Sequence, residues 1–339
     1  MKISKRTLFS LLAITGGAVY AGSTGYHIIH HYKIGGEGTW DYIKVDESAR
    51  RVYVAHQNEV DVVDADSGTV VGKIPAQGSH GIAIASSLGR GFITNGGADT
   101  VTVFDLKTLK KISDVPTGKK PDAIMYDPAT QRVFAMNGDS NSTTAIDAAS
   151  AKVAGTIDLG GAPEFAVPDG NGRFWVNLED KNEALLVDSK KLAVLKRFAL
   201  APCDEPASMA ADLSTHRLFI GCGNKKMAVV DSESGRVITT VPIGPHVDAT
   251  AFDNATKLIF SSTFDGHVTV VHEDSPDKFT VVDTLKTQQG SKTMDIDPKT
   301  HNLFLSGAAF TPALPAAAIR PPKGTKPTPD TFELLVLGK

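Results

Sequence analysis

The segment RGFITNGGADTVTVFD, residues 90–105, contains two apolar runs separated by a short polar turn. This pattern is typical of a β-hairpin whose second strand ends at Asp105. A single hairpin cannot bury its apolar face, because two strands leave that face open to water. The segment therefore predicts a larger sheet assembled from further strands.

The same phrase recurs along the chain at intervals of 41 to 43 residues. The first six copies end at Asp64, Asp105, Asp147, Asp188, Asp231 and His272. A seventh copy starts at HNLFLSGAAF and ends in TFELLVLGK, split by an insertion. Each copy is flanked by one more apolar strand on either side and by a connector with glycine or proline. A period near 42 with four strands per unit predicts an all-β fold, a seven-bladed β-propeller with four-stranded antiparallel blades.

The last blade is one strand short, because the chain ends at Lys339 after its third strand. The segment YHIIHHYKIGG, residues 26–36, can supply the missing strand, so we expect the N-terminal strand to complete the last blade. Along such a strand His27 and His31 share one face and His30 takes the other. The three histidines are therefore not expected to converge on a metal.

The N-terminal stretch MKISKRTLFSLLAITGGAVYA has a basic head, a short apolar run and a small residue at Ala21. These features predict a secretory signal peptide over residues 1–21 and one propeller domain over residues 22–339. The alternative is that this N-terminal stretch is not cleaved and serves as a membrane anchor. We expect the mature chain to have no transmembrane segment and to be periplasmic or secreted.

The composition gives no sign of a nucleic-acid partner. The formal net charge of the chain is −3, and loss of Lys2, Lys5 and Arg6 with the signal peptide makes it more negative. Neither that charge nor a basic patch with aromatic residues favours nucleic acid or an anionic lipid surface. We expect a monomer.

The stretches FITN…DTVTVFD and VYVAHQNEVDVVD resemble the YVTN-repeat family of seven-bladed β-propellers, of the exported bacterial type. The resemblance covers residues 26–339 and implies the propeller fold, which is related to WD40-like repeats. It implies little about activity, since similar folds include lactonases, surface-layer proteins and secreted proteins proposed to bind DNA.

The residue that enters the first strand of each blade is expected to line one mouth of the central channel, because that strand is innermost. This column reads Asp41, Gly81, Asp122, Glu164, Ala207, Asp248 and Lys292, and the connectors add His80, Glu205 and His246. Crowded carboxylates raise one another's pKa or recruit a cation. We predict ligand binding by Asp41, His80, Asp122, Glu164, Glu205, His246, Asp248 and Lys292.

A divalent cation is the only cofactor that these residues suggest. Its candidate ligands are Asp122, Glu164, Asp248 and His80, since carboxylates and imidazole suit Ca²⁺ or a transition metal. A structural alternative is open, because Asp or Glu ahead of a strand often caps the connector.

The ends of the second strands are expected on the same face of the ring. They would add polar groups around the opening, at His56, Asn95, Asn137, Asn177 and Cys222. Cys203, in the connector entering blade 5, should lie close to Cys222, and in an exported protein this pair predicts a disulfide.

The insertion in the last blade, residues 311–330, contains six prolines, which disfavour a sheet and favour extended polyproline geometry. It is a candidate partner-docking arm, lid or flexible loop. Arg320, Lys323 and Lys326 make it basic, so it could lie near the acidic mouth.

The sequence lacks C-x-x-C-H, H-E-x-x-H, P-loop and G-x-S-x-G motifs. These absences favour an exported, non-catalytic binding or scaffold propeller that recognises a protein, peptide or small cationic ligand at its acidic mouth. An enzymatic role stays open as the alternative, a divalent-metal-dependent lactonase-like hydrolase. A DNA-binding propeller is the second alternative, and the charge disfavours it.

Overall fold

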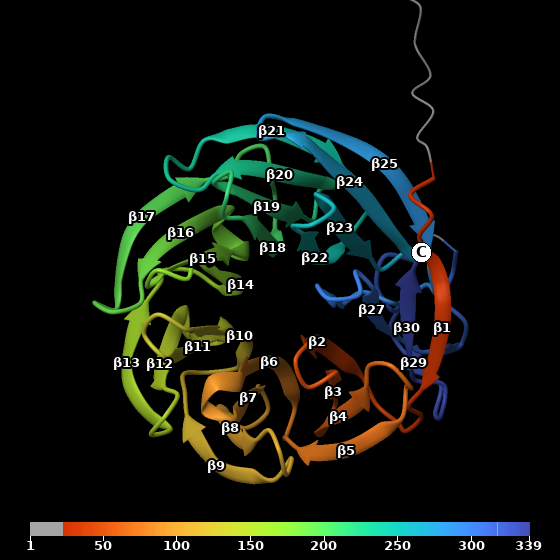
Figure 1. Cartoon of the computed structure of the whole chain (residues 1–339), viewed down its shortest axis with the longest axis horizontal. Helices are drawn as coiled ribbons and strands as arrows, with labels where there is room; N and C mark the ends of the chain where they lie inside the picture. The colour runs from red at the N-terminus through yellow and green to blue at the C-terminus, as the bar shows by residue number, and fades with distance from the viewer. Residues whose placement is uncertain (1–22, 317) are drawn as a thin grey trace, which may run out of the picture.

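The computed structural model describes residues 23–316 and 318–339 and forms a closed ring of seven four-stranded antiparallel sheets (Figure 1). The predicted seven-bladed propeller is confirmed. The expected signal peptide, residues 1–21, lies outside the described residues. In the part of the chain that the structure describes, the helices are short 3-10 turns, and none could span a membrane.

Each sheet is one blade, numbered here along the chain, and its first strand is innermost. Blades 1 to 3 consist of β2 (Trp40–Asp46), β3 (Arg51–His56), β4 (Glu59–Asp64) and β5 (Val70–Pro75); β6 (Ser79–Ala85), β7 (Arg90–Asn95), β8 (Thr100–Asp105) and β9 (Lys111–Pro116); β10 (Pro121–Asp127), β11 (Arg132–Asn137), β12 (Ser142–Asp147) and β13 (Lys152–Asp158). Three 3-10 turns, η1 (Ser86–Leu88), η2 (Gly138–Ser140) and η3 (Glu179–Lys181), lie between strands.

Blades 4 to 6 repeat this order, and blade 7 combines both ends of the chain. They consist of β14 (Pro163–Pro168), β15 (Arg173–Leu178), β16 (Glu183–Asp188) and β17 (Ala193–Ala199); β18 (Pro206–Asp212), β19 (Arg217–Cys222), β20 (Lys226–Asp231) and β21 (Val237–Pro242); β22 (Val247–Asp253), β23 (Leu258–Thr263), β24 (His267–Ser275) and β25 (Lys278–Lys286); β26 (Met294–Ile296), β27 (Leu303–Gly307), β30 (Glu333–Gly338) and β1 (His27–Lys33).

The core lies between blades rather than within any one of them. Phe134 of blade 3 and Phe174 of blade 4 have ring centroids 4.7 Å apart, and both side chains are fully buried. Phe92 of blade 2 belongs to one apolar cluster with Val133 and Ile146 of blade 3. Each blade buries its two apolar faces only against its neighbours, so the hairpin phrase must recur until the ring closes.

An arginine at the start of the second strand ties neighbouring blades together. Arg51, Arg90 and Arg132 donate from Nη1 to the carbonyl oxygens of Leu106, Ala148 and Ser189, each in the next blade. Arg217 of blade 5 repeats the contact by donating from Nε to the carbonyl oxygen of Pro276 in blade 6, whereas Arg173 of blade 4 pairs with the carboxylate of Glu233 in blade 5. Bonds from a charged donor to buried carbonyls are stronger than neutral ones, so this position adds a polar link to the apolar packing.

Strand β1 completes the sheet of blade 7 by pairing antiparallel with β30, with His27 opposite Gly338. His27, His30 and His31 are exposed on this strand at the rim. None belongs to a metal-compatible group of the described residues.

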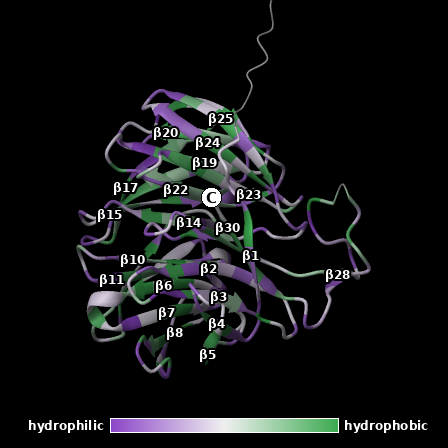
Figure 2. Cartoon of the chain, turned by 45° about the vertical axis from the view of Figure 1, so that its right-hand side comes forward, coloured by the Kyte–Doolittle hydropathy of each residue, from purple (hydrophilic) through white to green (hydrophobic). Residues whose placement is uncertain are grey.

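The predicted disulfide is present, with Cα atoms of Cys203 and Cys222 5.4 Å apart. The insertion projects from the ring (Figure 2). Its two ends do pair, as β28 (Phe310–Thr311) with β29 (Lys326–Pro327), contrary to the expectation from its prolines. The pairing is only two residues long and has Pro327 at its edge, where a missing N–H is tolerated.

The basic side chains of the insertion do not lie against the mouth residues. Arg320, Lys323 and Lys326 are exposed, and the ion pairs of the described residues include none of them. The base of the insertion is held by Phe310, which packs on Trp40 with ring centroids 5.8 Å apart.

Candidate functional site

A β-bulge recurs at the start of the inner strand in blades 1 to 6 and sets the position of the mouth residues. In blade 1, Trp40 pairs with His56 and Ile43 with Val54, so the inner strand has one residue more than its partner. The equivalent shift follows Ser79, Pro121, Pro163, Pro206 and Val247. Because a bulge redirects the side chain of the extra residue, it turns the residue after each of these positions out of the ladder.

The strand pairing in blade 2 shows that the predicted column of mouth residues is wrong there by one residue. Ser79 pairs with Asn95 as Trp40 pairs with His56, so His80, rather than Gly81, is the counterpart of Asp41. Gly81 is buried instead, and a Cβ there would lie 2.7 Å from the carbonyl oxygen of Asp122. With His80 in place of Gly81, the column has a base between the acids Asp41 and Asp122, which the sequence did not predict.

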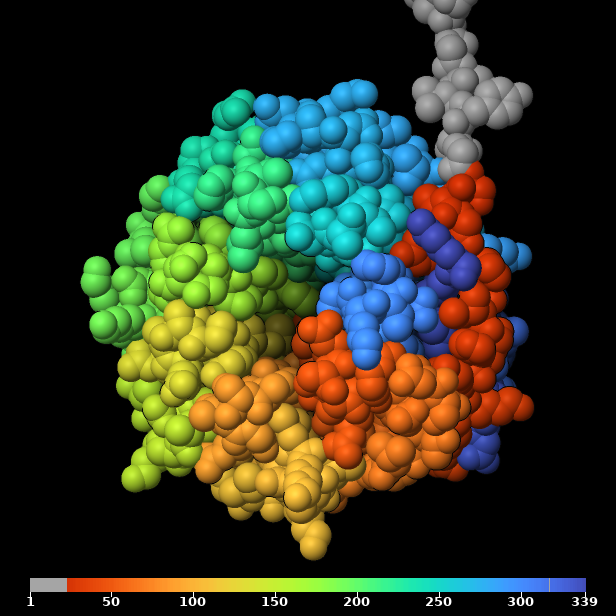
Figure 3. Space-filling view, in the orientation of Figure 1, coloured from red at the N-terminus to blue at the C-terminus, as the bar shows by residue number. Residues whose placement is uncertain are grey.

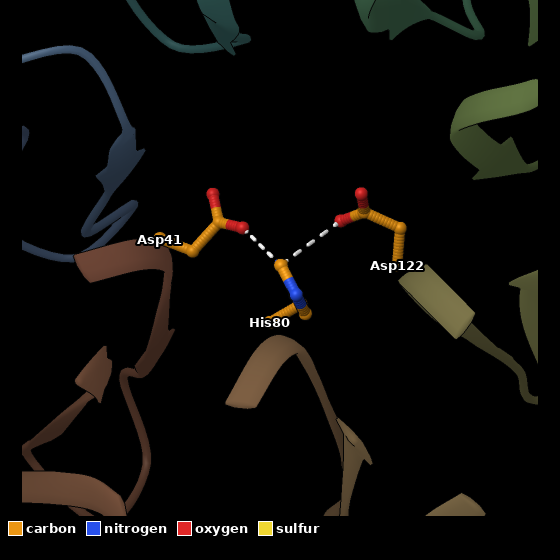
Figure 4. A group of neighbouring side chains, drawn as sticks. All are labelled: Asp41, His80 and Asp122. Atoms are coloured by element: carbon orange, nitrogen blue, oxygen red, sulfur yellow. Dashed lines mark hydrogen bonds and ion pairs between the residues drawn. The ribbon is translucent and has the colours of Figure 1, made fainter. Parts of the chain in front are cut away.

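Five mouth residues from five consecutive blades form one chain of ion pairs, which we call the mouth arc. Lys292 Nζ lies 3.4 Å from Asp248 Oδ2 and 3.6 Å from Asp41 Oδ1. His80 Nδ1 is hydrogen-bonded to Asp41 and lies 3.6 Å from Asp122 Oδ1 (Figure 4). The signs along the arc are acid, base, acid, base, acid, so it is largely neutralised from within. The members of the mouth arc are Asp248, Lys292, Asp41, His80 and Asp122.

The pKa shifts in the mouth arc follow these contacts. Burial opposes ionisation of Asp41, but Lys292 and His80 hold its pKa below the usual value. Burial and the charge of Asp41 raise the pKa of Asp122 to about 6. Burial disfavours the charged His80, yet its bond to Asp41 and the charge of Asp122 raise its pKa. The arc therefore changes charge near neutral pH.

Beyond Asp122, the mouth carries acids without a cation in their column. Burial raises the pKa of Glu164 well above its usual value, and the charges of Asp122 and Glu179 add to the effect. Burial and the charge of Glu205 raise the pKa of Glu179. We call Glu164, Glu179 and Glu205 the acidic sector. Glu179, at the start of η3, was missed because it lies outside the strand that the sequence comparison aligned.

The structure does not bring His246 and Glu205 into the mouth arc. Each directly precedes the first residue of its inner strand, is exposed, and has a left-handed φ, 54° for His246 and 50° for Glu205. They stand above blades 5 and 6, beside Glu179. Blade 5 contributes only Ala207 to the column itself.

The polar residues at the ends of the second strands do not surround the opening, which corrects that expectation. Asn95 Nδ2 donates to Thr102 Oγ1 at 2.9 Å, and Asn137 Nδ2 donates to Thr144 Oγ1 at 3.0 Å. His56 Nδ1 bonds to Asp61 at 2.8 Å. These pairs are buried inside blades and brace the hairpin. Asn177 is also buried and donates to Ser208, while Cys222 is in the disulfide.

An aromatic pair crosses the channel below the mouth. Tyr42 follows Asp41 in blade 1, Phe165 follows Glu164 in blade 4, and their ring centroids are 5.8 Å apart. Blades 1 and 4 are not neighbours, so the two aromatic side chains meet across the central channel. Burial raises the pKa of the Tyr42 hydroxyl well above its usual value, and the charges of Glu164 and Asp122 raise it further. The mouth is therefore a shallow acidic cup with an aromatic floor.

One group at the mouth has the composition of a metal site. Single ligand atoms of Asp41, His80 and Asp122 all lie within 4.8 Å of one another. This differs from the predicted ligand set, because Asp41 takes part and Glu164 and Asp248 do not. The Lys292 ammonium and the bond with His80 satisfy Asp41 without an ion, whereas Asp122 Oδ1 has no hydrogen-bond partner among the described residues.

The fold and its channel define the chain as a seven-bladed β-propeller. No protein-family model matches it, and no curated protein matches it either. Among solved structures it is similar to Kuenenia stuttgartiensis hydrazine synthase, with a TM-score of 0.69, 14% identity and coverage of 81% of this chain and 94% of that chain. It is also similar to U3-55K, with a TM-score of 0.74, 10% identity and coverage of 91% and 98%. The RRP9 WD40 repeats give a TM-score of 0.76, 10% identity and coverage of 91% and 97%. At such identities the likeness shows the fold alone.

Proposed function

We propose that this chain is an exported, non-catalytic binding propeller of the YVTN-repeat type, whose signal peptide is residues 1–21. It recognises a cationic group of a protein, peptide or small molecule at the mouth of its channel. A disulfide between Cys203 and Cys222 is compatible with an oxidising compartment. We propose that it acts as a monomer.

The observation that carries the proposal is the uneven balance of charge around the mouth. Lys292 and His80 are used by the three carboxylates of the mouth arc. Among the described residues no ion pair joins a member of the acidic sector to a cation, although His246 lies close enough to Glu179 to lower its pKa. A ligand ammonium or guanidinium would supply the missing partner and relieve the repulsion between Glu164 and Asp122.

A binding measurement with a defined cation tests the proposal. The probe is a fluorescein-labelled octalysine peptide at low ionic strength, with octaglutamate as the charge-reversed probe. We expect octalysine alone to bind, and Glu164→Gln with Asp122→Asn to weaken it by about fivefold or more, on the scale of one to two lost charge contacts. The matched control is Glu47→Gln, an exposed acid in the turn at the other end of the inner strand. Equal affinity of the double variant and wild type would refute the site.

The second candidate function is a divalent-metal-dependent lactonase-like hydrolase, favoured by the group of Asp41, His80 and Asp122. These residues would hold the ion, which would polarise a carbonyl and activate a water. Elemental analysis of protein purified without chelator, with thermal shifts on adding Ca²⁺, Mn²⁺ or Zn²⁺, separates the two candidates. Metal-free protein without a thermal shift would exclude the hydrolase and leave the binding proposal standing.

A further inference from the structure

A second concave site lies inside the channel, next to the aromatic pair, and of the mouth arc only Asp248 borders it. It is a cavity of about 390 Å³ lined by the inner strands of all seven blades. The space-filling view shows the centre of the ring hollowed (Figure 3). Such a volume would hold about a dozen waters at liquid density and lies within the range of small-molecule sites. We call this cavity the channel chamber.

Tyr42 and Phe165 form the end of the channel chamber that faces the mouth. Both rings line the cavity, and they meet across it with centroids 5.8 Å apart. The other lining residues lie along the inner strands, from Asp248 at the mouth to Tyr126 and Ile296 near the strand ends. Asp41, Asp122 and Glu164 do not line the chamber, and Asp248, which does, is paired with Lys292.

Apolar side chains are the most numerous in the wall of the channel chamber, which also contains Asp248, Asp295 and Lys44. Ile84, Ile124, Val167, Phe252 and Ile296 line it, and each is only partly buried although it lies on an innermost strand. Water in contact with such side chains forms few hydrogen bonds with them, so an apolar ligand that displaces it gains the hydrophobic contribution.

One cation stands in this apolar wall. Lys44 is the single Lys or Arg among the described residues that line the chamber, and its side chain is 43% exposed. Its Nζ donates to Asp295 Oδ2 at 3.0 Å. Asp295 also accepts from the backbone N–H groups of Val45 and Ile296, both at 2.9 Å. The carboxylate thus has three donors, whereas the ammonium uses one of its three N–H groups.

From this arrangement we infer that the channel chamber binds a small amphipathic molecule, whose apolar body contacts the inner strands and whose carboxylate pairs with Lys44. A carboxylate fits because the two unused N–H groups of Lys44 are charged donors, and an anionic acceptor forms a stronger hydrogen bond with them than a neutral acceptor does. The inference does not rest on the proposed function at the mouth. The two sites select opposite charges, and of the mouth arc only Asp248, which is paired with Lys292, borders the chamber.

Binding of 2-naphthoate and its neutral analogue 2-naphthalenemethanol, measured by calorimetry, tests this inference. We expect 2-naphthoate to bind wild-type protein with one-to-one stoichiometry. Lys44→Met keeps the apolar stem and removes the charge, so it should weaken 2-naphthoate at least tenfold and change 2-naphthalenemethanol less than threefold. Lys107→Met, an exposed lysine in a turn, is the matched control and should change neither.

Filling the cavity provides an independent readout. Ala211→Phe places a ring in the chamber wall and should weaken both probes at least tenfold, and Ala211→Leu serves if the larger variant does not fold. A crystal of the complex with 6-bromo-2-naphthoate should place bromine in the chamber. The inference is overturned if wild type binds neither probe, if Lys44→Met weakens both equally or neither, or if bromine lies at the mouth or on the outer surface.

Discussion

The imidazole of His80 in blade 2 is hydrogen-bonded through Nδ1 to the carboxylate of Asp41 in blade 1, and the same nitrogen lies 3.6 Å from Asp122 Oδ1 in blade 3. One side chain thus connects three inner strands at the mouth of the channel. The arrangement compensates two carboxylates that would otherwise repel each other across a narrow opening.

Loss of the His80 side chain is expected to destabilise the propeller. His80→Ala should lower the free energy of unfolding by about 1–3 kcal/mol, because Asp41 and Asp122 lose a shared, partly buried partner. Urea denaturation measures the change. His27→Ala, an exposed histidine on β1, is the control and should stay within about 0.5 kcal/mol of wild type. Equal stability of the two variants would show that the mouth arc does not contribute to the stability of the fold.

The position of the His80 imidazole depends on Gly96 in the adjacent turn. A Cβ at Gly96 would lie 2.8 Å from Cδ2 and Nε2 of His80, so Gly96→Ala should push the ring away from Asp41. The effects of Gly96→Ala and His80→Ala on stability are then expected to be less than additive. Gly97→Ala is the matched control, since its Cβ would meet its nearest neighbour, the Gln77 carbonyl oxygen, at 3.4 Å. A Gly96 variant as stable as the Gly97 variant would contradict the prediction.

Cation binding at the mouth is expected to strengthen as pH rises. Burial and Asp41 raise the pKa of Asp122 to about 6, and burial with neighbouring acids raises that of Glu164. The pKa of His80 is raised as well, chiefly by Asp41 against the effect of burial. Asp122 loses its proton around pH 6, and each further proton lost by Glu164 or His80 as pH rises also makes the mouth more negative.

Octalysine affinity measured at constant ionic strength should therefore be higher at pH 8 than at pH 5. Asp122→Asn with Glu164→Gln should flatten the profile, because two of the titrating groups are removed. An affinity that falls with rising pH would be the opposite of what the mouth charges require.

The arginine contacts between blades are expected to stabilise the fold away from the channel. Arg132 Nη1 donates to Ser189 O at 2.7 Å and to Lys190 O at 3.1 Å. Arg132→Ala should lower the free energy of unfolding by about 1–3 kcal/mol, since bonds to a charged donor are lost. Arg236→Ala, at an exposed arginine, should cost no more than about 0.5 kcal/mol in the same denaturation experiment. The assignment fails if the two variants behave alike.

The disulfide is expected to contribute to stability without affecting the mouth. It closes a short loop, since Cys203 and Cys222 are 19 residues apart in sequence. Replacing both with serine should lower the free energy of unfolding by roughly 3 kcal/mol on the loop-entropy scale. Octalysine affinity should change by less than about twofold, because of the acidic sector only Glu205 lies in this loop, and Glu164 and Glu179 belong to blade 4. A change of about fivefold or more would show that the disulfide positions the binding site.

The repeat made the fold predictable, because a regular spacing of hairpins fixes the number of blades and the position of each strand. The expectation for Gly81 was wrong for a local reason. The bulge adds a residue between Ser79 and Ile82, and no residue type marks it in GSHGIAIA. A one-residue error in register moves a side chain from the channel to the interior.

The balance of charge at the mouth could not be predicted from the aligned column of mouth residues alone. Sequence alignment placed Asp41, Asp122, Asp248 and Lys292 at one level, but it did not show that Lys292 lies between two of the acids or that His80 bridges the others. These contacts join consecutive blades, and they depend on where the bulge at the start of each inner strand directs the side chain. The burial of Asn95 and Asn137 was missed because a polar residue at a strand end is typical of both solvent-exposed and hydrogen-bonded positions.

The pairing of β1 with β30 brings the first and last described residues of the ring into contact. Gly25 lies against the side chain of Lys339, and Lys339 Nζ stands 5.2 Å from the centre of the Tyr26 ring. A short peptide could therefore join the two ends without bending any strand. A circularly permuted chain, cut in a connector between two other blades, would keep every sheet and every contact at the channel. The order in which the blades are synthesised is thus separable from the shape they build.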